Sequence, residues 1–120
     1  MPKRNILIIM ADRELQQLLV DFCAACGIAT VTADNVASVR TILRRQRVTE
    51  VITDDLQGEW QHLVRIVQQA GAIPLTLWAV DEQDRCQAER FGIRFVNQNR
   101  FALPELVNIE SERKGDSSGK

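Results

Sequence analysis

Five short apolar runs, most of them rich in β-branched residues, alternate along the chain with five segments in which apolar residues recur at helical spacing. The apolar runs lie at residues 6–9, 28–32, 50–56, 73–79 and 94–97, and the helical segments at 12–26, 35–47, 59–69, 81–91 and 104–109. Short connections between such strands and helices require parallel strands, right-handed crossovers and helices on both faces of the sheet. The pattern therefore predicts an α/β protein built as a three-layer sandwich.

Cap and stop signals mark the ends of the expected helices. Asp12 suits the first N-cap, Gly27 ends the same helix, and Asp34 or Asn35 suits the second N-cap. Pro104 fits the first turn of the last helix. The first helix is expected to turn one set of residues toward the core: Leu15, Leu18, Leu19, Phe22 and Cys26.

The third apolar run ends in two carboxylates, Asp54 and Asp55. A buried parallel strand that ends in an acid delivers it to the carboxyl edge of the sheet, where ligands bind in open α/β folds. Only one of the two can occupy the edge position that faces the neighbouring strand ends. We favour Asp55; Asp54 takes that position if the strand ends early or its register shifts by one residue.

Composition narrows the possible functions. The chain has 120 residues, of which 45% are apolar and 26% charged, and its formal net charge is −1. These values are typical of one globular domain, which we place at residues 1–110, followed by a polar tail or linker at 111–120 that we expect to be disordered. The chain has no excess of positive charge of the kind that binds nucleic acid, and no apolar run is long enough for a membrane span. Three cysteines without an export signal indicate a cytoplasmic protein.

Several short motifs occur in a defined order. The third apolar run begins with Glu50 and reaches Asp55 five residues later, the fourth begins Ile73-Pro74, and the fifth follows Gly92. In this order the chain resembles the receiver domain of bacterial response regulators, which histidine kinases phosphorylate. The resemblance covers residues 5 to about 110. It implies a flavodoxin-like (βα)5 sandwich with the strand order 2-1-3-4-5, and it makes Asp55 the counterpart of the phosphoacceptor.

The resemblance fails at the positions that carry the chemistry. Receivers have two acids after the first strand, where this chain has Met10 and Ala11. They end the fourth strand in Ser or Thr and the fifth in Lys, where this chain has Ala79 and Gln98. Phosphoryl transfer to a carboxylate needs Mg²⁺, which prefers oxygen ligands, and a cation to neutralise developing charge. The remaining acids beside Asp55 are Asp12 and Asp54.

We therefore expect a non-catalytic pseudo-receiver without a metal or cofactor, which binds a protein partner without being phosphorylated. The partner is a separate protein or a covalently linked output domain, and the chain is a candidate homodimer. Direct binding of nucleic acid or membrane is not expected. One alternative is a working receiver that uses Asp55 with metal ligands from Asp12 or Asp54. Another is a flavodoxin-like domain that binds a small molecule, although no glycine-rich phosphate loop follows the first strand.

Other reactive or charged residues have simpler interpretations. Cys23 and Cys26 have redox spacing, but they lie at the end of a helix, where the helix dipole does not favour a thiolate, so we expect them to face the core. His62 has no apparent partner for a catalytic triad. Four arginines cluster near the end of the second helix and indicate a solvated face or a docking patch for an acidic partner: Arg40, Arg44, Arg45 and Arg47.

Overall fold

The computed structural model describes residues 3–100 and 102–109. Within them, five parallel strands form one sheet in the order β2-β1-β3-β4-β5. The strands are β1 (Asn5–Ile9), β2 (Ala29–Thr32), β3 (Glu50–Thr53), β4 (Leu75–Ala79) and β5 (Arg94–Asn97). The predicted strand order is confirmed. The expected tail at residues 111–120 lies outside the described part of the chain.

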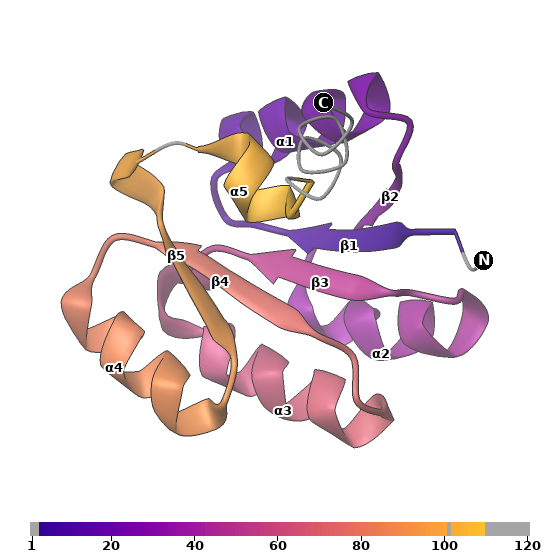
Figure 1. Cartoon of the computed structure of the whole chain (residues 1–120). Coiled ribbons are helices and arrows are strands. Elements are labelled where there is room, and N and C mark those ends of the chain that lie inside the picture. Colours follow the sequence, from indigo (N-terminus) through magenta and orange to yellow (C-terminus); the bar gives the residue numbers. More distant parts are fainter. Residues whose placement is uncertain (1–2, 101, 110–120) are drawn as a thin grey trace, which may run out of the picture.

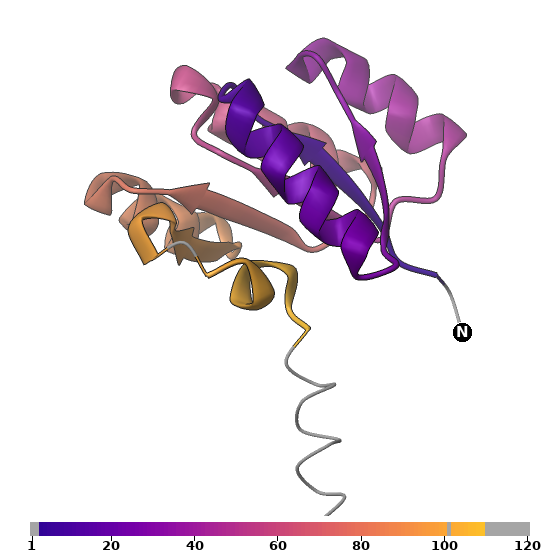
Figure 2. The ribbon, with the colours of Figure 1, turned by 90° about the horizontal axis from the view of Figure 1, so that it is seen from above.

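Helices cover both faces of the sheet, which gives the predicted three layers (Figure 1). The helices are α1 (Arg13–Ala25), α2 (Val36–Arg45), α3 (Trp60–Ala70), α4 (Glu82–Phe91) and α5 (Leu103–Val107). Helices α1 and α5 lie side by side on one face, while α2, α3 and α4 cover the other (Figures 1 and 2). Among the described residues, no helix combines the length and the apolar character that a membrane span requires.

The sheet separates two hydrophobic clusters, because successive side chains of a strand point to opposite faces. Leu7 and Ile9 of β1 pack toward α2 and α3, whereas Ile6 and Ile8 pack toward α1 and α5. All five residues of β4, which lies between β3 and β5, are buried. Burying a large apolar side chain contributes about 1.5–3 kcal/mol, so these alternating strands account for much of the stability of the fold.

The buried face of α1 differs from the prediction. Leu18 is 41% exposed and Cys26 is exposed, whereas Gln16 is only 8% exposed. Cys23 is fully buried, as expected. Gln16 tolerates burial because its Oε1 atom accepts the backbone N–H of Met10 at 3.0 Å. Helical spacing did identify Leu19, which is fully buried.

Strand β3 ends earlier than the apolar run predicted. Its last residue is Thr53, and after two aspartates the chain enters a 3₁₀ turn, η1 (Leu56–Gly58). Leu56 and Gln57 both have left-handed backbone angles, with φ of 50° and 53°. Non-glycine residues rarely adopt this conformation, and burial of the Leu56 side chain offsets part of its cost. The tight turn replaces the end of the predicted strand.

Arginines at the opposite edge of the sheet fix the last helix. Two nitrogens of the Arg4 guanidinium donate to the Glu50 carboxylate, and one of them also donates to the carbonyl of Val107. Arg94 donates to the carbonyls of Glu105 and Leu106. The last carbonyls of a helix lack an intrahelical donor. Here Asn108 N–H bonds the Glu105 carbonyl, and the two arginines attach the end of α5 to β3, to β5 and to the residue before β1.

Candidate functional site

A cleft of about 310 Å³ lies at the carboxyl edge of the sheet, where β1, β3, β4 and β5 end. Its lining residues are Ala11, Asp12, Asp54, Asp55, Gln57, Trp78, Ala79, Val80 and Gln98. All the site residues predicted from the sequence line this cleft except Met10. The parallel register brings them together, because Ile9 pairs with Thr53 and Ala79 with Asn97 at the ends of the strands.

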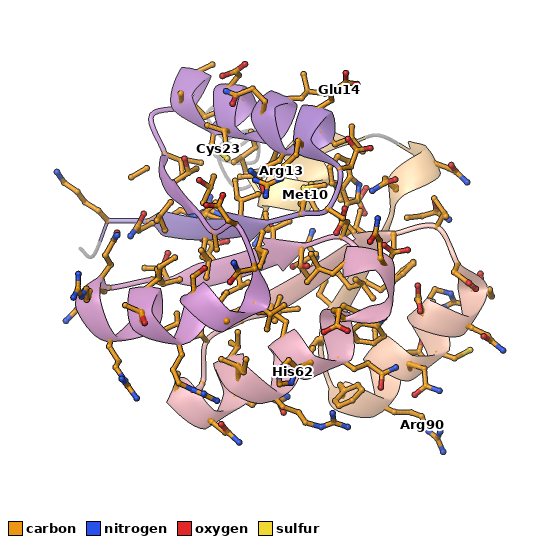
Figure 3. All side chains as sticks on the ribbon, turned by 180° about the vertical axis from the view of Figure 1, so that it is seen from behind. Met10, Arg13, Glu14, Cys23, His62 and Arg90 are labelled. Carbon is orange, nitrogen blue, oxygen red and sulfur yellow. The ribbon has the colours of Figure 1, made fainter. Side chains whose placement is uncertain are left out.

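Met10 belongs to the core instead of the cleft. Its side chain is 2% exposed and packs in the cluster that also contains Leu19 and Cys23. Figure 3 shows Met10 beneath α1. The strand alternation continues past β1, so Met10 points to the same face as Ile6 and Ile8. A core side chain therefore occupies the position at which the receiver resemblance places an acid.

Asp54 is the acid that directly follows β3, and it is 5% exposed. Its Oδ1 atom accepts the backbone N–H of Leu56 at 2.9 Å, and its Oδ2 atom accepts that of Asp12 at 3.1 Å. The N–H of Ala11 lies 3.1 and 3.0 Å from the two oxygens. The Asp54 carboxylate thus joins the β1–α1 loop to the turn after β3.

Asp54, the alternative to the Asp55 that we favoured, is thus the acid that directly follows the last residue of β3, and both aspartates line the cleft. The reason is the early end of β3 at Thr53, which moves the edge position back by one residue. Asp55 is exposed, and its Oδ1 atom accepts the N–H of Gln57 at 3.0 Å, which caps the 3₁₀ turn. Which of the two carboxylates corresponds to the receiver phosphoacceptor stays a prediction.

Asp12, the third acid of the cleft, also serves the local backbone. Its Oδ1 atom accepts the N–H of Leu15 at 3.1 Å, which is the predicted N-cap of α1. Each of the three carboxylates at the cleft therefore accepts at least one backbone N–H group. Within the described residues, no group of three or more His, Cys, Asp or Glu side chains is arranged to hold a metal ion.

The other predicted positions leave the cleft without a positive charge. Ala11 and Ala79 contribute methyl groups, and the side-chain amide of Gln98 donates to the carbonyl of Trp78 at 3.2 Å. Gln98 thereby links the end of β5 to β4. The sequence did not indicate the lining residues Gln57, Trp78 and Val80, because none of their side chains carries a charge.

The rim of the cleft is acidic as well. Asp84 of α4 accepts the indole N–H of Trp60 at 3.2 Å. Partial burial raises the pKa of Asp84, the hydrogen bond from Trp60 lowers it, and the nearby charges of Asp81 and Asp55 raise it further. Negative charge thus accumulates around this edge, and no lining residue of the cleft is basic.

The cysteines and the histidine form no second site. Burial raises the pKa of the Cys23 thiol to about 11, with a further contribution from Cys26, so Cys23 stays protonated and unreactive at neutral pH. Cys26 and Cys86 are exposed, which contradicts the core position expected for Cys26. Figure 3 shows Cys23 on the side of α1 that faces the sheet and His62 on α3, across the sheet.

No protein-family model matches this chain, and no curated protein sequence does either. Solved structures do match. A response regulator receiver protein from Pseudomonas putida is 22% identical with a TM-score of 0.74, and the match covers 90% of this chain and 98% of that one. A two-component response regulator from Clostridium difficile is 17% identical with a TM-score of 0.79, over 91% of this chain and 94% of that one.

A response regulator from Thermotoga maritima gives the same result, with 18% identity and a TM-score of 0.76 over 92% of this chain and 97% of that one. The three matches span nearly the full length of both chains in each pair. The chain therefore has the flavodoxin-like α/β fold of response regulator receiver domains.

Proposed function

We propose that this chain is a receiver-like domain that is not phosphorylated and that acts by contact with a protein partner, either a separate protein or a linked domain. The observation that carries the proposal is the state of the Asp54 carboxylate. Both of its oxygens accept backbone N–H groups, from Ala11, Asp12 and Leu56. A carboxylate held in this way must give up backbone hydrogen bonds before it ligates a metal or attacks phosphorus.

The rest of the cleft supports the same conclusion. Mg²⁺ needs several oxygen ligands in octahedral geometry, and the three carboxylates available are already bonded to the backbone. These residues do not fit a Mg²⁺ site. The transferring phosphoryl group also needs a nearby cation, whereas the cleft offers the neutral amide of Gln98 and an acidic rim. Ala79 has no hydroxyl group with which to bind a phosphoryl oxygen.

A second candidate function is a working phospho-switch that uses Asp55. It is favoured by one observation: Asp55 is exposed at the cleft, with Asp12 and Asp54 lining the same space. In this case Asp54 would have to exchange backbone N–H groups for a metal ligand, whereas Asp12 and Asp55 each accept one N–H through Oδ1 and would ligate the metal through Oδ2. The rearrangement would loosen the bonds by which Asp54 joins the β1–α1 loop to the turn after β3.

Incubation with acetyl phosphate and Mg²⁺, followed by intact-mass spectrometry, distinguishes the two functions. We expect the chain to stay unmodified under conditions that phosphorylate an active receiver domain run in parallel. Wild-type protein that gains one phosphoryl group, when Asp55→Asn does not, would establish the phospho-switch. If the wild type and Asp55→Asn both gain the phosphoryl group and Asp54→Asn does not, the proposal is also overturned, and Asp54 is the acceptor.

A further inference from the structure

The helices α2 and α3 carry an unusual charge distribution. Residues 36–49, which contain α2 and the segment after it, include four arginines and no acid, and α3 adds Arg65 and likewise no acid. All five side chains are exposed: Arg40, Arg44, Arg45, Arg47 and Arg65. The whole chain has a formal net charge of −1, so the remainder of the molecule is net acidic.

Three exposed or half-buried arginines elsewhere in the described residues pair with carboxylates, while Arg94 donates to backbone carbonyls instead. Arg4 pairs with Glu50, Arg13 with Asp34, and Arg85 with both Glu82 and Glu89. Over the described residues, no carboxylate lies within ion-pair distance of the four arginines at 40, 44, 45 and 47. Arg40 reaches only the side-chain oxygen of Gln69 on α3, at 3.5 Å. These guanidinium groups are therefore free to pair with a partner.

A groove of about 340 Å³ runs between α2 and α3 on this surface. Its lining residues are Arg40, Leu43, Arg44, Ile66, Gln69 and Ala70. Arg40 and Arg44 are four residues apart on α2, so they lie on the same face of the helix. Leu43, Ile66 and Ala70 supply apolar surface between the two helices. We call this surface the arginine groove.

We propose that the arginine groove binds an acidic amphipathic segment of a partner protein. Carboxylates of the segment pair with Arg40 and Arg44, and an apolar side chain packs against Leu43 and Ile66. The planar guanidinium group binds carboxylates through two parallel hydrogen bonds, which gives this pairing both strength and orientation. The inference deepens the proposed function and rests on it in one respect, namely that the domain acts by protein contact.

Stabilisation of α2 by its own arginines does not explain the groove. Positive charge in the last turn of a helix interacts favourably with the helix dipole, which accounts for Arg44 and Arg45. Arg40 lies before that turn, where the effect of the dipole has fallen off. Arg40 nevertheless lines the groove together with Arg44, on the surface where the two helices meet.

Nucleic acid and membrane fit the groove less well than an acidic peptide does. Nucleic acid binding relies on many phosphate contacts, and the acidic remainder of this chain opposes them. The groove also lacks an aromatic side chain on which a base could stack. Its apolar residues Leu43 and Ile66 call for a ligand with an apolar side chain between its charges, which a phosphate backbone does not offer.

The test measures fluorescence anisotropy of a labelled amphipathic peptide in which glutamates at helical spacing flank leucines, titrated with the full chain. We expect saturable binding that weakens as salt rises, and a Kd at least tenfold higher for the double variant Arg40→Ala/Arg44→Ala. A matched control, Arg13→Ala/Arg85→Ala, removes two exposed arginines elsewhere and should change the Kd less than twofold. A peptide with Leu→Ala and a peptide with Glu→Gln should both bind at least tenfold more weakly.

The inference is overturned by a wild-type chain that does not bind the peptide saturably, by an equal loss in the control variant, or by a Leu→Ala peptide that binds as well as its parent. Tighter binding of single-stranded DNA or of anionic vesicles through the same two arginines would also overturn it. Phosphorylation is measured separately by mass. Failed peptide binding by an unmodified chain removes only this inference, and a phosphorylated chain that still binds the peptide removes only the proposed function.

Discussion

The cleft at the carboxyl edge of the sheet and the arginine groove between α2 and α3 each collect groups of one charge, but they hold them in opposite ways. In the cleft, Asp12, Asp54 and Asp55 all accept backbone N–H groups. In the groove, Arg40 and Arg44 have no carboxylate partner within the described chain. The carboxylates of the cleft are bonded within the chain and stabilise the fold. The two guanidinium groups of the groove have no carboxylate partner in the described chain and are available to bind another molecule.

The largest effect is expected from Asp54→Ala. It leaves the N–H groups of Ala11, Asp12 and Leu56 without their acceptor at a buried position. Each orphaned donor costs about 1–3 kcal/mol, but water can enter the vacated space, so we expect the free energy of unfolding to fall by about 2–4 kcal/mol. Urea unfolding followed by tryptophan fluorescence measures the change.

The matched control is Asp55→Ala, which removes the neighbouring carboxylate from an exposed position where it caps a single N–H group. A lost cap of this kind typically costs about 1 kcal/mol. The contrast between cleft and groove is lost if the two substitutions lower the free energy of unfolding equally. In that case the buried Asp54 would stabilise the fold no more than the exposed cap at Asp55 does.

A smaller effect is expected at the rim of the cleft, from Asp84→Asn. The folded state raises the pKa of Asp84, chiefly by burial, and therefore binds its proton more tightly than the unfolded chain does. Asp84 therefore stabilises the folded state at pH values below the usual aspartate pKa. This stabilisation is lost as the pH rises through the pKa that Asp84 has in the folded state. Asn keeps an acceptor for Trp60 and removes the charge. After allowance for solvent screening, we expect a gain of up to about 0.5 kcal/mol at pH 7.

Urea unfolding at pH 4 and pH 7 tests this expectation. The difference in stability between wild type and Asp84→Asn should be larger at pH 7 than at pH 4. If Asp84→Asn is the less stable protein at pH 7, then the charge of Asp84 strengthens its bond to Trp60 by more than the acidic surroundings oppose it.

The smallest effect on stability is expected in the groove. Arg40→Ala/Arg44→Ala removes side chains that make no ion pair in the described structure, and alanine favours the helix at least as well as arginine does. We expect the free energy of unfolding to change by less than about 0.5 kcal/mol in urea. A loss above about 1.5 kcal/mol would show that these arginines stabilise the fold, and the contrast with the cleft would disappear.

Most of the fold was predictable because it depends on periodicity. The order of strands and helices, the N-caps at Asp12 and Asn35, and the helix end at Gly92 all follow from local patterns. The buried face of α1 was less predictable. Gln16 is buried because one backbone N–H lies within its reach, and hydropathy does not report such a partner.

The candidate site was predictable in composition but not in detail. The sequence identified six of the nine residues that line the cleft, because strand ends meet at one edge of a parallel sheet. It did not separate Asp54 from Asp55, since the choice depends on left-handed backbone angles at Leu56 and Gln57, which no residue preference indicates. Nor did it show that Met10 would join the core.

The bonds that attach α5 to the sheet also bring the two ends of the described chain together. Arg4 donates to the carbonyl of Val107, so residues more than a hundred positions apart in sequence lie within the length of one side chain. A short linker between these ends would close the domain into a ring, and the exposed segment at Gly71 and Ala72 offers a place to open it again. The same closeness would let the domain be inserted whole into a surface loop of a host protein without forcing the two halves of the host apart.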